Sequence, residues 1–442
     1  MSGHLLFPAP DGRAGQHCAA AVSRYRDVAL HVGLRAGAAG LAFVAQIGLV
    51  RLLGAERYGD YILFATACSL LFIFACSGLD TVVLRRVAIQ ADSGAGTPVA
   101  AIVRRAGLVS MATALLTVTA FSALRAMPAI ERWSAQLPSL AWIAAGVLSM
   151  TVLAIALSAA RGSRRFLLAD TAEGILKPLA MLGVAALLLT SGAMPPTQVA
   201  YAALLVANLL ATGMALLAFR SWNAAPLPTA AAHDRPALLR PREAAGLVCY
   251  ALMAYAMFQL DTLLVGLYSG TQEAGAYNMA CNFVRLVIFV PLILAARAQP
   301  TVARQFARQE FAALRAALRS DLRRSVGTAA ACAVVLMACG RSLLHAVDPS
   351  HAVAYGALCI LALAHVVNSA VIVLNAALLM CAAQRTVVLA QLCGLAFSLP
   401  LYLLLIPRFG MAGAAVAVLA GLSANAAALA WQSPRVFARP TP

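Results

Sequence analysis

Apolar runs of about 20 residues, separated by short polar segments, fill most of this 442-residue chain. A run of this length is what an α-helix needs to cross the hydrocarbon core of a bilayer. The runs lack the alternating polarity of transmembrane barrel strands, so we predict helices. The predicted spans are twelve: 28–53, 58–79, 106–126, 138–160, 167–190, 197–219, 245–268, 277–300, 325–347, 352–380, 386–406 and 411–431.

The composition supports a membrane protein. Hydrophobic residues make up 62% of the chain and charged residues 11%, and the mean hydropathy is +0.85. A soluble domain carries about 25% charged residues, which it needs to cover its surface. We therefore predict an all-α polytopic membrane protein.

The net charge is +17, and most of the positive residues lie in the segments between the apolar runs. A basic soluble protein would suggest nucleic acid as a partner, but here the cations concentrate in alternate loops, as the positive-inside rule requires, and no nucleic acid is expected. We therefore expect both termini to lie in the cytoplasm. The exceptions in outer segments are Arg57, Arg125, Arg132, Arg341 and Arg408.

Two similar phrases, RLLGAERYGDY (51–61) and GTQEAGAY (270–277), each join the first and second helix of a six-helix half. Glycine permits unusual backbone angles in a tight turn, and tyrosine is favoured at a membrane interface. A second pair of similar segments aligns Arg164 with Arg385. The repeat predicts two lobes in the same orientation. The first pair of similar segments aligns Gly54 with Gly270, Gly59 with Gly275, and Tyr61 with Tyr277.

The predicted organisation has five parts. The first 27 residues lack a long apolar core and are interpreted as a tail, not a signal peptide. The segment 297–324 is basic, and Phe311, Leu314 and Leu318 share a face, so an amphipathic helix at the inner leaflet is expected. The parts are a tail (1–27), an N-lobe (28–219), a cytoplasmic linker (220–244), a C-lobe (245–431) and a C-terminal tail (432–442).

Several phrases resemble a known family. VRLLGAERYGDYILF, followed later by LDTVVLRRVA, resembles the opening hairpin of bacterial polysaccharide flippases. QLDTLLVGLYSGTQEAGAYNMA and VPLILAARAQPTVARQF resemble their seventh and eighth helices, and PRFGMAGAAVAVLAG resembles the entry to the last helix. The family belongs to the superfamily that includes the multidrug and toxin extrusion (MATE) exporters. The resemblance spans most of the chain, from about residue 33 to 431.

The resemblance implies a MATE-like flippase fold and a function. Such proteins move an undecaprenyl-pyrophosphate-linked oligosaccharide from the inner to the outer leaflet, by alternating access to a cationic cavity. Twelve spans, where lipid II flippases have fourteen, favour surface or exopolysaccharide units over a peptidoglycan precursor. Membrane lipids, a polysaccharide polymerase and export machinery are then expected partners.

Charges inside predicted spans are candidate functional groups, because each costs at least about 2.5 kcal/mol to insert. Arg35 lies about eight residues into the first span, and Gln46 lies on the same face. Arginine pairs with a pyrophosphate in forked geometry, so this face suits a cavity wall. The alternative is that Arg35 reaches back to the inner interface.

The eighth span has a polar face of Asn278, Asn282 and Arg285, which sugar hydroxyls or a pyrophosphate could use. Asp261 in the seventh span is a candidate partner of Arg285, either as a structural ion pair or as a proton-coupled element.

The fifth span holds Glu173 and Lys177, the only lysine, at the spacing of a helical ion pair. Lys177 could instead face the cavity as a second phosphate contact.

Two other functions remain open. A drug or cation antiporter of the same superfamily should have an excess of buried carboxylates, whereas this chain has 16 acids in all. A membrane polymerase or glycosyltransferase needs a sizeable outer loop with catalytic groups. The longest outer candidate, 127–138, has one acid, and neither a catalytic nor a phosphate-loop motif occurs. We therefore expect a transporter with no cofactor and no metal site.

Overall fold

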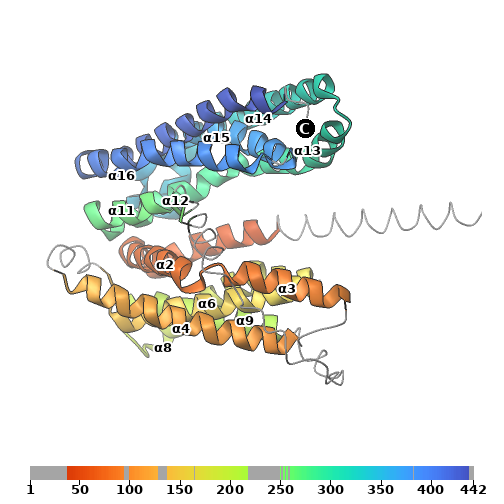
Figure 1. Ribbon diagram of the computed structural model, residues 1–442. Helices are drawn as coiled ribbons and strands as arrows, with labels where there is room; N and C mark the ends of the chain where they lie inside the picture. Colours follow the sequence, from red (N-terminus) through yellow and green to blue (C-terminus); the bar gives the residue numbers. More distant parts are fainter. Residues whose placement is uncertain are drawn as a thin grey trace, which may run out of the picture.

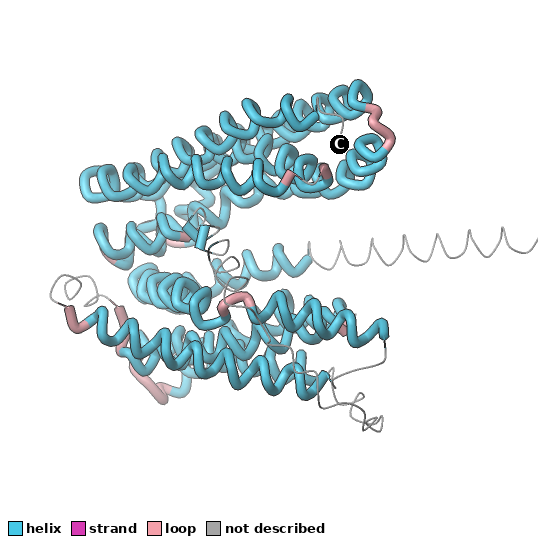
Figure 2. The backbone as a smooth tube through the Cα atoms, in the orientation of Figure 1, coloured by secondary structure: helices cyan, strands magenta, loops and turns pink. Residues whose placement is uncertain are grey.

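The computed structural model describes residues 37–93, 99–127, 137–163, 165–217, 249, 252–253, 255–256, 259–381 and 383–437. All regular secondary structure in these ranges is helical, which confirms the predicted all-α class. Figures 1 and 2 show two stacked groups of helices, an N-terminal lobe and a C-terminal lobe.

The N-terminal lobe begins with the Gly37–Leu53 helix. It continues with α2 (Ala55–Cys76), α3 (Leu79–Ser93), α4 (Val99–Arg125), α6 (Leu140–Gly162), α7 (Phe166–Thr171), the π-helix η1 (Ala172–Leu176), α8 (Lys177–Ser191) and α9 (Pro196–Leu217). The C-terminal lobe contains α11 (Leu260–Ser269), α12 (Thr271–Val284), the 3-10 helix η2 (Arg285–Ile288), α13 (Phe289–Ala307), α14 (Phe311–Val347), the 3-10 helix η3 (Pro349–Ala354), α15 (Tyr355–Met380) and α16 (Gln384–Phe437).

Each predicted span has a helical counterpart. Nine helices in the described ranges are long and apolar enough to cross a membrane, and Gly37–Leu53 and Leu260–Ser269 are shorter apolar helices. The last two predicted spans are the halves of α16, which Gly410 divides with a φ of 53°. The first part of the seventh predicted span lies largely outside the described residues.

The predicted amphipathic helix over 297–324 is wrong. The chain turns at Arg308–Glu310, where Gln309 has a φ of 58°. The first part therefore belongs to α13 and the second to α14, which continues without interruption into the ninth span. Leu314 and Leu318 are buried against α13 and α15, so this apolar face packs inside the protein and not in the inner leaflet.

The repeated glycines form matching turns. Gly54 and Gly270 have φ values of 82° and 100°, and each precedes the first residue of a helix, α2 or α12. Only glycine adopts this backbone region without strain. Tyr61 and Tyr277, the tyrosines of the repeat, are both buried and pack inside the protein. Arg164, of the second pair of similar segments, lies outside the described residues.

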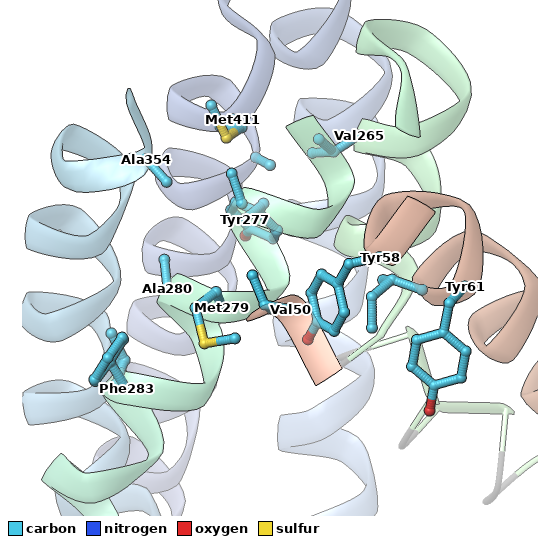
Figure 3. Close-up of a cluster of buried hydrophobic side chains, with 14 of the residues drawn as sticks. Val50, Tyr58, Tyr61, Val265, Tyr277, Met279, Ala280, Phe283, Ala354 and Met411 are labelled. Carbon is cyan, nitrogen blue, oxygen red and sulfur yellow. The ribbon is translucent and has the colours of Figure 1, made fainter. Parts of the chain in front are cut away.

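The two lobes meet where α2 packs on α12 (Figure 1). A Cβ added at Gly59 would lie 1.9 Å from the carbonyl oxygen of Thr271, and one added at Gly275 would lie 3.1 Å from the Cα of Gly59. The equivalent glycines of the repeat therefore face each other across the contact between the lobes. One buried cluster, which includes Tyr58 and Tyr277, extends from this contact into both lobes (Figure 3).

We expect Gly59→Ala to destabilise the protein. Its methyl group would overlap the backbone of α12, and overpacking of this kind typically costs about 1–3 kcal/mol. The melting temperature of the detergent-purified protein should fall, as followed by loss of helical signal. Gly183→Ala is the matched control, because a Cβ there meets nothing within 4 Å. A melting temperature equal to that of the wild type in Gly59→Ala would show that the lobes do not need this close approach.

Candidate functional site

A polar cavity of about 310 Å³ lies between the two lobes. Its walls come from the Gly37–Leu53 helix, α2 and α8 on one side and from α12 and η2 on the other. A volume of this size falls in the range of ligand pockets, about 300–1,000 Å³. Its polar lining residues are Gln46, Thr66, Ser69, Glu173, Lys177, Gln259, Asn278, Asn282 and Arg285.

A second pocket, of about 610 Å³, adjoins the polar cavity. The two share Ala42, Gln46, Asn282 and Arg285, so they are contiguous. Beyond these shared residues the lining of the second pocket is apolar and comes from the Gly37–Leu53 helix on one side and from η2 and α13 on the other. The apolar lining residues are Ala39, Gly40, Phe43, Leu286, Ile288, Phe289 and Leu292.

A row of hydrogen bonds follows α12 into the polar cavity. Arg285 Nη1 donates to Asn282 Oδ1 at 3.0 Å, and Asn282 Nδ2 donates to Asn278 Oδ1 at 3.1 Å. The structure therefore brings the predicted polar face of the eighth span together as one connected row, which ends in a guanidinium at the junction of the two pockets.

Tyr58 of α2 connects this row to the other lobe. Its hydroxyl lies 2.9 Å from Gln46 Oε1 and 3.2 Å from Asn278 Oδ1. A phenol has one proton, so Tyr58 donates to one of these two carbonyl oxygens at a time. Tyr58 was not predicted as a site residue. The signal was available, because it directly precedes Gly59 of the repeated phrase.

Arg35 lies outside the described residues, so its place in the cavity stays a prediction. Ala39 and Ala42, which share its predicted face, line the apolar pocket. Gln46, from the same face, lines both pockets.

The predicted ion pair between Asp261 and Arg285 is not formed. Asp261 is buried and accepts hydrogen bonds from the Tyr277 hydroxyl at 2.8 Å and from the backbone N–H of Thr262 at 2.7 Å. Arg285 instead donates to Asn282 and faces the cavity. The carboxylate is thus held inside the C-terminal lobe by neutral donors, which satisfy it without a cation.

The predicted pair of Glu173 and Lys177 is replaced by a different one. Glu173 accepts a hydrogen bond from Arg161 Nη2 in an ion pair, and the same nitrogen lies 3.5 Å from Asp170 Oδ1. Lys177, which lines the polar cavity, has no ion-pair partner among the described residues. The i,i+4 rule assumed a regular α-helix, but η1 occupies the stretch between the two residues.

Proline explains why both cavity cations lie at helix irregularities. Lys177 directly follows the π-helix η1 and Arg285 opens the 3-10 helix η2. Pro178 and Pro291 have no N–H and clash with the carbonyls four residues earlier, which belong to Gly174 in η1 and to Val287 in η2. Irregular turns of this kind occur frequently at functional sites.

The cavity is closed at the end where α2 and α12 begin. Arg51 Nη2 donates to the carbonyl of Ala346 at 2.9 Å, and the ring of Tyr58 lies 6.3 Å from that of the fully buried His351. Asp348, at the start of η3, accepts hydrogen bonds from the backbone N–H and hydroxyl of Ser350, which hold the pKa of this carboxyl below its ordinary value.

Deeper in this closure, the Tyr255 hydroxyl donates to the carbonyl of Thr66 at 2.9 Å, and Leu63 packs on Gly266. The sequence marked none of these contacts, since each joins residues that are far apart in the chain. They add to the contacts between the lobes at this side of the cavity.

Comparisons with known proteins support this architecture. The chain matches the family described as Polysaccharide biosynthesis protein over residues 25–304 and the family described as MatE over residues 248–404. A search of curated protein sequences gives no match.

Three solved structures are similar to it. An inward-facing multidrug resistance MATE family transporter of the MOP superfamily is 12% identical, with a TM-score of 0.62 over 90% of this chain and 94% of its own. The lipid II flippase MurJ, in an inward closed conformation, is 14% identical, with a TM-score of 0.63 over 92% of this chain and 89% of its own. A MOP superfamily transporter from Pyrococcus furiosus, described by a binding pocket of reverse polarity that suggests a different function, is 13% identical, with a TM-score of 0.57 over 93% of this chain and 95% of its own.

At these identities the structural likeness shows a shared fold, which agrees with the MATE-like flippase fold predicted from the sequence. The match to the first family establishes the family of this chain, because it covers more than half of the chain. The chain therefore belongs to the polysaccharide biosynthesis protein family.

Proposed function

We propose that this protein moves a polyprenyl-pyrophosphate-linked oligosaccharide from the inner to the outer leaflet of a bacterial inner membrane by alternating access. The observation that carries the proposal is the place of Arg285. It lines both the polar cavity and the apolar pocket, so a ligand bound there would have a charged group between a polar part and an apolar part. A prenyl-linked glycan has this arrangement, with the pyrophosphate in the middle.

The apolar pocket suits a lipid chain. Leu286, Phe289 and Leu292 line it and are 40–49% exposed, so its wall is continuous with the surface of the C-terminal lobe. In a bilayer this surface contacts acyl chains, and a prenyl chain could remain in lipid while its head group occupies the polar cavity. Arg285 would pair with the pyrophosphate in the forked geometry that guanidinium offers to phosphate oxygens.

The conformation fits loading from the inside. The lobes are in contact at the end where α2 and α12 begin, and the charge distribution predicts that this end faces outward. The exchange of this closure for one at the opposite end would present the cavity to the outer leaflet. In the paired repeat, Gly59 and Gly275 are the positions where the lobes would have to separate.

An antiporter of drugs or cations is the second candidate, because the MatE match covers part of the C-terminal lobe. The charges of the cavity favour the flippase. Lys177 and Arg285 both line it, and its one lining carboxylate, Glu173, already pairs with Arg161. A cation entering this cavity would meet two positive groups, whereas a pyrophosphate would be attracted by them.

Arg285→Gln should strongly reduce flipping. The purified protein would be reconstituted in vesicles, and transfer of a labelled polyprenyl-pyrophosphate oligosaccharide between leaflets would be followed by its accessibility to an external lectin. Loss of a hydrogen bond to a charged group costs about 1.5–3 kcal/mol, so transfer should slow at least about tenfold. Arg385→Gln is the matched control, since this exposed arginine lines neither pocket.

Transfer at the wild-type rate in Arg285→Gln would refute the head-group site. If the wild-type protein transfers no glycan but takes up an organic cation against a proton gradient, the antiporter is the correct function.

The orientation has its own test. Since the cations concentrate in segments predicted to be inside, a reporter enzyme fused after residue 442 should be located in the cytoplasm. The same reporter fused within the predicted outer loop at 127–138 should be located in the periplasm. Periplasmic activity of the C-terminal fusion would overturn the topology and, with it, the direction of transport.

A further inference from the structure

We propose that Lys177 recognises a carboxylate on the oligosaccharide, so that the cargo is an acidic glycan containing a uronic acid. The inference rests on the proposed function, because it assumes that a prenyl-linked glycan occupies the cavity. It goes further by assigning the two cavity cations to different parts of the substrate.

The two cations differ in which pockets they line. Arg285 lines both the polar and the apolar pocket, whereas Lys177 lines only the polar one. In a prenyl-linked glycan the order is lipid, pyrophosphate, sugar. If the lipid lies in the apolar pocket and the pyrophosphate at Arg285, then whatever extends past Arg285 into the polar cavity is sugar. Lys177 therefore meets the glycan and not the pyrophosphate.

The ammonium group of Lys177 is available for a ligand. The carboxylate one turn earlier, Glu173, is engaged by Arg161, and Asp170 lies near the same guanidinium. Lys177 is partly buried and has no ion-pair partner among the residues described. Removing a charge from water without a partner is costly, so an anion that fills the cavity would gain the interaction that the protein leaves unmade.

The backbone holds this lysine in position. Gly174 in η1 packs on Ala38, and a Cβ at position 174 would lie 2.5 Å from the Cβ of that alanine. The π-helix is thus fixed against the first described helix. Glu173, Lys177 and Pro178 all line the cavity, and Glu173 pairs with Arg161 and not with Lys177. The irregular π turn therefore lies between two residues that the spacing rule for a regular helix would have paired.

The chemistry of the two cations matches this division. A guanidinium offers parallel N–H donors that suit the oxygens of a phosphate, whereas an ammonium is a compact charge on a flexible stem that one carboxylate can satisfy. The rest of the polar lining includes Thr66, Ser69 and Gln259, which can exchange hydrogen bonds with sugar hydroxyls. The cavity thus contains donors for a glycan and one additional positive charge.

The test compares two substrates that differ in one group. Both are polyprenyl-pyrophosphate disaccharides, with glucuronate or glucose as the second sugar. Transfer of each between leaflets is measured in vesicles that contain wild-type protein, Lys177→Gln, Lys177→Arg or the control Arg385→Gln. The wild type and the control should transfer the acidic substrate at least about tenfold faster, as expected for a charge-assisted hydrogen bond.

Lys177→Gln should lose the preference, so that it transfers the acidic substrate no faster than the neutral one. Its transfer of the neutral substrate also shows that the variant is folded. Lys177→Arg should keep most of the preference, because it retains the positive charge.

Two results would overturn the inference and leave the proposed function intact. Equal transfer rates for the two substrates in the wild type would show that the cavity does not recognise the carboxylate of the sugar. An equal loss of both substrates in Lys177→Gln would place Lys177 at the pyrophosphate or in the structure. Failure of the wild type to transfer either substrate would instead refute the proposed function and this inference with it.

Discussion

The close approach of α2 and α12 at Gly59 is the contact on which the rest of the arrangement depends. A Cβ at this position would overlap the carbonyl of Thr271, so only glycine allows the two helices to touch. Because the helices touch, Tyr58 is fully buried and its hydroxyl reaches both Gln46 in one lobe and Asn278 in the other. The contact therefore closes one end of the cavity and also connects the polar groups that line it.

The bilayer adds a second constraint, since every backbone polar group inside it must be satisfied within the protein. Proline breaks the regular ladder after both η1 and η2, and the chain adjusts with a π turn in one lobe and a 3-10 turn in the other. Both adjustments position a cation on the cavity wall. Both irregular turns thus lie beside the polar cavity.

Sequence patterns were sufficient for the fold and for part of the site. Long apolar runs specify spanning helices, and the repeated glycines specify equivalent turns, because both depend on local chemistry. The polar face Asn278–Asn282–Arg285 was also visible, since its spacing is that of one side of a helix. These properties need no knowledge of which helices are neighbours.

The errors came from partners that sequence spacing cannot show. The ion pair expected for Asp261 failed because Tyr277 and Thr262 already satisfy its carboxylate. The pair expected for Glu173 failed because Arg161 of α6 reaches it and because the helix is not regular there. Likewise, Leu314 and Leu318 form an amphipathic face, but only the tertiary structure shows that protein, not lipid, covers it.

The origin of the two cavity cations has a mechanical consequence. Lys177 belongs to the N-terminal lobe and Arg285 to the C-terminal lobe. A ligand with one anionic group at each cation would contact both lobes, so its binding free energy would depend on how the lobes are placed relative to each other. A ligand can shift a conformational equilibrium only by its difference in affinity for the two states. A cavity with one cation on each lobe can provide such a difference, whereas two cations on one lobe would move together and would hold the anion equally well in both states.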